Sequence, residues 1–149
     1  MKKLFILLLL SFSFGSVAFG QTRKSVSGTE VTGTFRSYFK GKFKGNYNEI
    51  KVLALGKGKL KVSFGLTYPF IDGTGNLDAN VGEAEGTADI VGDTAIFSSA
   101  EDGEPCKITI KFVKPGQIKV IQNDSCGFGL NVSADGIYQK VSKAKPKFE

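Results

Sequence analysis

Residues 59–68 read Lys-Leu-Lys-Val-Ser-Phe-Gly-Leu-Thr-Tyr, so a large apolar side chain occupies every second position. Side chains of an extended chain alternate between its two sides, which places Leu60, Val62, Phe64, Leu66 and Tyr68 together on one side. Lysine, serine, glycine and threonine fall on the other side. This pattern predicts a β-strand with one buried face and one solvated face.

The rest of the chain repeats this alternation between glycine-rich turns. We predict eight strands, at 31–39, 47–55, 59–68, 83–90, 95–100, 106–113, 117–123 and 135–142. Turn residues such as Gly56-Lys57-Gly58 and Lys114-Pro115-Gly116 separate neighbouring strands. The sequence therefore predicts an all-β fold, in which about eight antiparallel strands form a small up-and-down barrel without exposed strand edges. A two-sheet β-sandwich is the alternative.

The first twenty residues, MKKLFILLLLSFSFGSVAFG, are typical of a secretory signal peptide. Two lysines precede the apolar run 4–10, and Ala18 and Gly20 are the small residues of a cleavage site before Gln21. The apolar run is too short for a comfortable membrane span. We therefore expect a periplasmic or secreted protein without a membrane span.

This assignment divides the chain into four parts. We expect a signal peptide at 1–20, a flexible N-terminal segment at 21–30, a β-barrel domain at 31–142 and a basic tail at 143–149. The part that remains after cleavage has the length of one ordinary domain, and we expect it to be a monomer.

Both cysteines lie in the exported part, where oxidation is the default state. A hairpin folded about Pro115 brings Cys106 opposite residue 124, and Cys126 follows two residues later. We therefore predict a Cys106–Cys126 disulfide that clamps the open end of this hairpin. Closing such a loop contributes about 3 kcal/mol in the chain-entropy model.

Charge is divided into blocks along the chain. Residues 22–61 carry ten basic and two acidic side chains, and residues 107–149 carry eight basic and three acidic ones. The block between them holds nine carboxylates and no lysine or arginine: Asp72, Asp78, Glu83, Glu85, Asp89, Asp93, Glu101, Asp102 and Glu104. In a barrel this becomes an acidic sector beside a basic one. The two sectors either attract each other and keep the protein soluble, or steer a charged partner.

Aromatic and basic residues interleave in the run 36–47, Arg-Ser-Tyr-Phe-Lys-Gly-Lys-Phe-Lys-Gly-Asn-Tyr. Single-stranded nucleic acid binds to such surfaces, but export argues against that partner. We interpret the run as a strand pair with a cationic outer face and an aromatic inner face. Binding of an anionic envelope polymer is the alternative.

The acidic block has one feature that resembles a calcium loop. Oxygen-bearing residues recur at alternate positions and then close with a glutamate, at Asp72, Thr74, Asn76, Asp78, Asn80 and Glu83. The sixth position, where such a loop needs glycine, is Leu77. We therefore interpret the segment as a polar β-connection and expect no metal.

The chain has no histidine, and pairing of its cysteines would leave no free thiol. The commonest general bases and thiol nucleophiles are therefore missing. Glu83 and Glu85 would share one side of a strand, roughly 7 Å apart, but an acidic block produces such pairs by chance. We expect a protein that is not an enzyme and needs no cofactor.

Five segments of the C-terminal half carry a resemblance: 82–88, 92–97, 106–112, 126–132 and 136–138. The paired Cys106 and Cys126 and the closing Gly136-Ile137-Tyr138 resemble a group of small exported bacterial β-barrel proteins, over residues 48–142. The plan is also similar to that of periplasmic lysozyme inhibitors, eight-stranded barrels that plug the lysozyme cleft with loop residues. Residues 133–138 differ in spacing from the inhibitors' Ser-Gly-x-x-Tyr loop, so no inhibitory residue carries over.

These observations favour an exported, non-enzymatic binding protein, and an envelope hydrolase such as lysozyme is the suggested partner. The acidic residues expected in turns are the candidate contacts, namely Asp72, Asp78, Glu101, Asp102 and Glu104. The first alternative is a lipocalin-like carrier, whose barrel holds a small apolar ligand among its aromatic side chains. The second is a structural envelope component that holds an anionic polymer on its basic strands.

Overall fold

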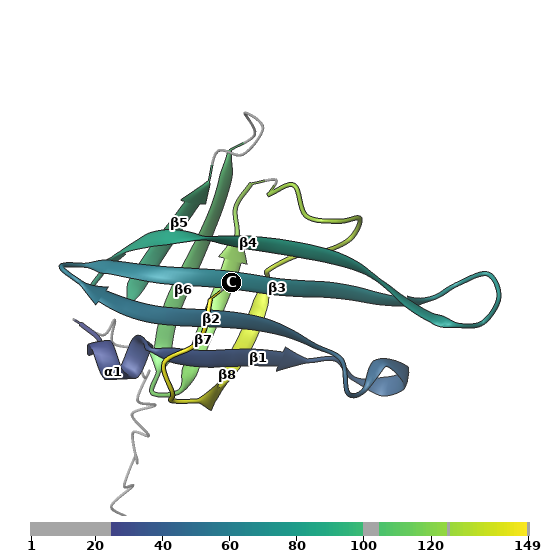
Figure 1. Cartoon of the computed structure of the whole chain (residues 1–149), viewed down its shortest axis with the longest axis horizontal. Coiled ribbons are helices and arrows are strands. Elements are labelled where there is room, and N and C mark those ends of the chain that lie inside the picture. Colours follow the sequence, from purple (N-terminus) through teal and green to yellow (C-terminus); the bar gives the residue numbers. More distant parts are fainter. Residues whose placement is uncertain (1–24, 100–104, 125, 149) are drawn as a thin grey trace, which may run out of the picture.

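A computed structural model describes residues 25–99, 105–124 and 126–148. Antiparallel strands, each paired with its neighbours in chain order, form a closed barrel (Figure 1). They are β1 (Gly33–Tyr38), β2 (Tyr47–Gly56), β3 (Lys59–Ile71), β4 (Leu77–Val91), β5 (Thr94–Ser99), β6 (Cys106–Lys114), β7 (Gln117–Gln122) and β8 (Gly136–Ser142). This confirms the predicted up-and-down barrel, in preference to a sandwich. Residues 1–24, which include the predicted signal peptide, lie outside the described residues.

Alternation of burial along the strands produces the core. In β3, Leu60, Val62, Phe64 and Leu66 are each at most 2% exposed, as the alternation predicts. Tyr68 differs, because it is 40% exposed and lies where β3 runs past the body of the barrel. Apolar side chains from all eight strands line the interior, and Phe64 meets a ring from β5, that of Phe97, edge to face at 5.1 Å.

One end of the barrel, here the turn end, carries the short connections 57–58, 92–93 and 115–116. A single helical turn, α1 (Gly28–Val31), packs against β2 at this end and buries Val31. Ser27 caps the helix by accepting a hydrogen bond from the N–H of Glu30. The predicted first strand begins at Gly33 rather than residue 31, because Val31 belongs to the helix.

The amine of Lys140, in β8, holds α1 in place. Its Nζ donates to the carbonyls of Thr29, Glu30 and Thr32 at the C-terminal side of the helix. Burial lowers the pKa of Lys140 below its ordinary value.

A second short helix, the 3-10 turn η1 (Gly41–Phe43), lies between β1 and β2. No helix in the described part of the chain has the length and apolar character that a membrane span requires.

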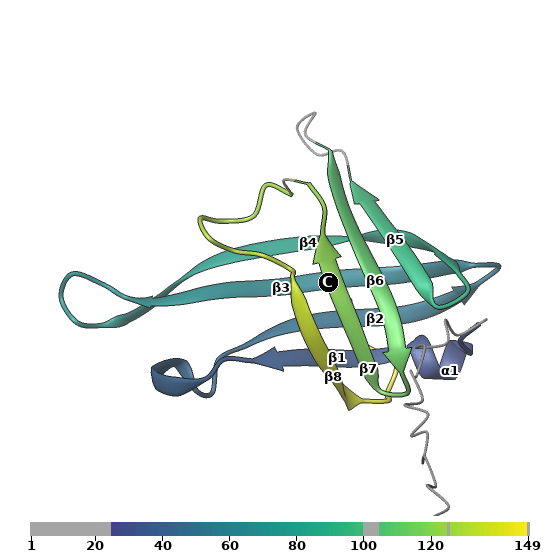
Figure 2. The same cartoon turned by 180° about the vertical axis from the view of Figure 1, so that it is seen from behind.

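The opposite end, here the loop end, carries the connections 39–46, 72–76 and 123–135. β3 ends at Ile71 and β4 begins at Leu77, so this hairpin is longer than the predicted strands 59–68 and 83–90. Residues 67–81, here called the arm, project past the body of the barrel on the same side as η1 (Figures 1 and 2). The first of these strands was predicted to end at Tyr68, before Pro69. That end was too early, because Pro69 still pairs with Ala79.

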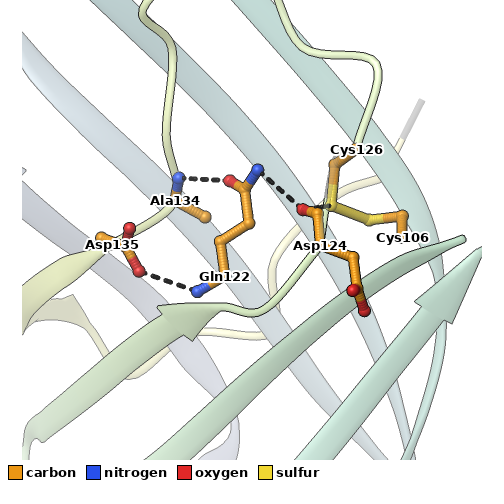
Figure 3. The surroundings of a disulfide bond; sticks show 6 residues. All are labelled: Cys106, Gln122, Asp124, Cys126, Ala134 and Asp135. Carbon is orange, nitrogen blue, oxygen red and sulfur yellow. Dashed lines mark hydrogen bonds between the residues drawn. A yellow bond between two sulfur atoms is a disulfide. The ribbon is translucent and has the colours of Figure 1, made fainter.

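The connection 123–135 joins β7 to β8 and contacts β4 at the loop end. The predicted disulfide is confirmed, and it joins Cys106 at the start of β6 to Cys126 in this connection (Figure 3). Gln122 links the two ends of the connection, since its Oε1 accepts from the N–H of Ala134 and its Nε2 donates to the carbonyl of Asp124. At the β4 side, the N–H of Gly129 donates to the carbonyl of Val81.

Candidate functional site

The tip of the arm is a tight turn organised by Asp72. One oxygen of Asp72, Oδ1, accepts from the N–H groups of Thr74 and Asn76 and from the Thr74 hydroxyl. These hydrogen bonds, the backbone bond from Asn76 first among them, lower the pKa of Asp72. The carboxylate therefore stabilises the turn and stays charged at the outermost point of the arm.

The other predicted contact residues have different positions. Asp78 lies in β4, paired with Phe70, and not in a turn, because the strand already begins at Leu77. Glu101, Asp102 and Glu104 lie outside the described residues. The structure therefore brings Asp72 and Asp78 together on the arm. The segment that resembled a calcium loop divides between this turn and strand β4.

The outer face of the arm carries three large apolar side chains that are exposed, Ile71, Leu77 and Val81. Register pairs place Ile71 beside Leu77, Pro69 beside Ala79 and Thr67 beside Val81, all on the side that faces away from the barrel interior. Leu77 is 55% exposed and Val81 is 62% exposed. Ile71 is 44% exposed, whereas Pro69 on the same face is buried and Thr67 is polar. Exposed apolar side chains on a projecting hairpin are typical of a protein-binding surface.

Next to the arm, a hollow opens on the outer face of β2, β3 and β4. Glu49, Gly65 and Glu83 stand in one row across the three strands, and Gly65 leaves the middle position without a side chain. The hollow has a volume of about 430 Å³, and Lys51, Ser63 and Glu85 complete its polar wall. Within the described residues, no lysine or arginine nitrogen lies within ion-pair distance of Glu83. The hollow therefore offers one uncompensated carboxylate.

A second exposed group lies on the same face, beside Glu49. Tyr38 and Tyr47 are paired across β1 and β2 with ring centroids 5.6 Å apart, and Tyr38 is 53% exposed. Arg36 stacks 4.0 Å from the centroid of the Tyr47 ring and forms an ion pair of 2.6 Å with Glu49. The expected division into a cationic outer and an aromatic inner face is therefore wrong for these tyrosines, because they share the outer face with Arg36.

The acidic and basic sectors meet where β3 pairs with β4. Lys59 forms an ion pair with Asp89 at 2.5 Å, and Lys61 forms one with Glu85 at 2.7 Å. These pairs show attraction between the sectors, which is one of the two interpretations made from the sequence. Exposed pairs of this kind contribute at most about 1 kcal/mol each.

The interior of the barrel is filled by its own side chains. Phe35, Phe64, Phe97, Phe112 and Tyr138 are all buried and occupy much of the space between the strands. The hydroxyl of Tyr138 donates to the carbonyl of Ala134, which belongs to the connection 123–135. This packing favours a protein that binds on its surface over one that carries a ligand inside.

The charged groups around the hollow are largely compensated by neighbouring side chains. Groups of three or more metal-ligating side chains are absent from the described residues. Of the carboxylates around the hollow, Glu49 is neutralised by Arg36 and Glu85 by Lys61. What remains for a partner is a hydrogen-bonding hollow, an exposed pair of tyrosines and an apolar arm.

Sequence reasoning missed the outer face of the arm. One signal was present, because Leu77, Ala79 and Val81 continue the alternation of β4 ahead of the predicted strand. It missed the hollow as well, because the row of Glu49, Gly65 and Glu83 depends on the register of three strands. Register is set by side-chain packing and turn geometry across the sheet.

Comparison of the chain with protein-family models, curated proteins and solved structures finds no match in any of the three.

Proposed function

We propose that this chain is an exported, non-enzymatic binding protein that uses the arm and the adjoining outer face to hold a protein partner. The exposed apolar face of the arm, at Ile71, Leu77 and Val81, is the observation that carries this proposal. These side chains do not pack into the barrel core. Their apolar surface therefore contributes a favourable free energy only when a partner covers it and removes it from water.

The shape of the arm suggests how the protein acts on that partner. The two-stranded hairpin of the arm projects past the barrel (Figure 1), and this narrow shape suits entry into a cleft of the partner. Asp72 and Asp78 add negative charge near its tip, which complements a basic protein such as lysozyme. The proposed partner is therefore an envelope hydrolase with a basic, cleft-shaped active site, which the arm would inhibit.

The test is an activity assay with c-type lysozyme and a matched pair of variants. Val81→Lys places a charge on the arm, whereas Val91→Lys places the same charge in the same strand at the turn end, where Val91 is 82% exposed. We expect inhibition by the unchanged protein, a loss of roughly tenfold or more with Val81→Lys, and no change with Val91→Lys. Absence of inhibition at a large molar excess would exclude lysozyme as the partner.

A further inference from the structure

The floor of the hollow on β2, β3 and β4 is a continuous part of the sheet. β3 pairs with β2 on one side and with β4 on the other from Lys59 to Gly65. Gly65 leaves the middle without a side chain, and Glu49 and Glu83 stand on either side of it. The volume of about 430 Å³ lies in the range of roughly 300–1,000 Å³ that small-molecule sites occupy. The hollow therefore has the size of a ligand site.

The charges at the hollow balance. Among the described residues, three acidic and three basic side chains line the hollow or form ion pairs with its wall: Glu49, Glu83, Glu85, Arg36, Lys51 and Lys61. Their formal charges cancel, so the hollow does not select an ion by net charge. The carboxylates accept hydrogen bonds, Lys51 donates them, and the Ser63 hydroxyl does both. This mixture suits a neutral ligand with many hydroxyl groups, each of which also donates and accepts.

Aromatic rings stand at one end of the hollow. Tyr47 precedes Glu49 by two positions and lies on the same outer face, about 7 Å further along β2. Tyr38 is paired with Tyr47 from β1, and the two ring centroids are 5.6 Å apart. Arg36 stacks 4.0 Å from the centroid of the Tyr47 ring, whereas Tyr38 is 53% exposed. Tyr38 therefore offers a ligand an exposed aromatic ring beside the hollow.

The C-terminal tail brings another aromatic ring to the opposite end of the hollow. Residues 143–148 run from the end of β8 across the outer face toward β3 (Figure 1). The Phe148 ring lies 4.6 Å from Nζ of Lys61, and the same amine forms the 2.7 Å ion pair with Glu85 in the wall of the hollow. In the register, Lys61 stands beyond Ser63, on the side away from the tyrosines. The polar hollow therefore lies between two aromatic groups.

We propose that this hollow binds a neutral oligosaccharide. One sugar ring lies over Gly65, where its hydroxyl groups donate to Glu83 and accept from Lys51. The flanking sugar units pack their C–H faces on Tyr38 at one end and on Phe148 at the other, because the negative face of an aromatic ring attracts such groups. This inference goes beyond the proposed function, since it assigns a second kind of ligand to a site next to the arm.

The direct test is a titration of the isotope-labelled protein with cellotriose, maltotriose and chitotriose, followed by nuclear magnetic resonance. We expect at least one of these neutral trisaccharides to bind with a Kd of about 1 mM or lower and to shift the amides of Lys51, Ser63 and Gly65. Because the hollow carries no net charge, this Kd should change by less than about twofold between low and high salt. No saturable shift with any of the three would overturn the proposal, as would tighter binding of the anionic trigalacturonate.

The variant Gly65→Val fills the hollow without straining the strand. A Cβ at Gly65 would meet the backbone oxygen of Glu49 at 4.0 Å, an ordinary contact, and β-branched residues suit strands. We expect the trisaccharide to bind roughly tenfold more weakly or worse. The matched control, Gly73→Val, makes the same change at the tip of the arm, where a Cβ meets nothing within 4 Å, and should leave the Kd unchanged. Equal weakening in both variants, or unchanged binding in Gly65→Val, would overturn the proposal.

Two further variants test the aromatic ends of the site. Tyr38→Ala and Phe148→Ala each remove a ring that lies outside the barrel core, so we expect both variants to stay folded by circular dichroism. Each should raise the Kd of the trisaccharide roughly threefold. A Kd that changes in neither variant would contradict a ligand that extends from the hollow to both rings.

The outcomes of the two proposals are separable when lysozyme inhibition and saccharide binding are measured on the same variants. Inhibition that survives in Gly65→Val, together with lost trisaccharide binding, would support the hollow as a site of its own. Saccharide binding without inhibition by the unchanged protein would support the hollow and remove the proposed inhibitory function. Inhibition without saccharide binding would keep the arm and overturn the hollow. Loss of both in Gly65→Val would place the protein partner in the hollow and overturn the assignment of a second ligand.

Discussion

The two ends of this barrel are closed by different structural features. At the turn end, two-residue connections join the strands, and α1 covers the interior with Val31 held beneath it. At the loop end, one long connection crosses the barrel mouth and is held by the Cys106–Cys126 disulfide and by Gln122. The turn end is therefore closed by backbone geometry, and the loop end by cross-links between distant residues.

The difference between the two ends indicates which of them offers a binding surface to a partner. Short turns leave little chain beyond the barrel, whereas the arm and η1 extend past it (Figure 2). Binding residues concentrate on connections that a rigid scaffold positions. We therefore expect substitutions that release the loop-end connection to reduce stability most, and substitutions on the arm to reduce binding with little change in stability.

The largest effect is expected from removal of the disulfide. The double variant Cys106→Ser, Cys126→Ser opens a cross-link with a sequence separation of 20 residues. We expect a loss of about 3 kcal/mol in the free energy of unfolding, measured by urea denaturation. Reduction of the unchanged protein should produce the same shift. A midpoint equal to that of the oxidised protein would show that the loop end closes without the cross-link.

A smaller loss is expected where the connection rests on β4. A Cβ added at Gly82 would lie 2.8 Å from Phe128, so Gly82→Ala forces this ring and its backbone to move. We expect a loss of about 2 kcal/mol. The matched control is Gly73→Ala at the tip of the arm, where nothing lies within 4 Å. A control that destabilises as much as Gly82→Ala would contradict the difference between arm and connection.

The pH dependence of the free energy of unfolding tests how Tyr138 contributes to the closure of the loop end. Burial raises the pKa of Tyr138, so the folded protein keeps the phenol neutral while the unfolded chain ionises it. The resulting stability is complete below the ordinary tyrosine pKa of about 10 and is lost as the pH rises above it.

Tyr138→Phe should remove this alkaline dependence. It should also cost about 1.5 kcal/mol at neutral pH, because the carbonyl of Ala134 loses its donor. Urea denaturation at several pH values between neutrality and the alkaline range measures both effects. An unchanged slope of stability against pH in the variant would assign the alkaline loss to another group.

At the turn end, Lys140→Met should act locally. The variant removes the donor to the carbonyls of Thr29, Glu30 and Thr32 and keeps most of the side-chain volume. We expect a loss of about 1 kcal/mol, together with faster amide exchange in α1 and unchanged exchange on the arm. Faster exchange at both ends would show that the two closures are coupled.

The smallest change in stability is expected on the arm itself. Leu77→Lys alters a side chain that is 55% exposed, so we expect a change below about 0.5 kcal/mol in the free energy of unfolding. The same variant should bind the proposed partner roughly tenfold more weakly. Retained binding in Leu77→Lys would move the binding surface away from the arm.

The alternation of Leu60 to Leu66, the turns and the position of the cysteines were sufficient to predict the barrel and its disulfide. These features are local, or depend on the register of one short hairpin. The arm was not predicted, because a strand that continues past Pro69 carries the same residue types as a loop. The positions of Tyr38 and Tyr47 were misjudged, because alternation gives two faces but does not say which one a neighbouring strand leaves exposed.

The amino-acid sequence by itself determined the strands in the body of the barrel, the core positions Leu60 to Leu66 and the cysteines that pair, because each follows from side-chain alternation and short-range chain geometry. Only the tertiary structure decided that the arm extends past the barrel, that Gly65 leaves a hollow between Glu49 and Glu83, and that β5 pairs with β4 over Ala88–Val91. The physical reason is that these features depend on how far each pair of strands remains in contact, and that length is set by the twist and closure of the whole sheet.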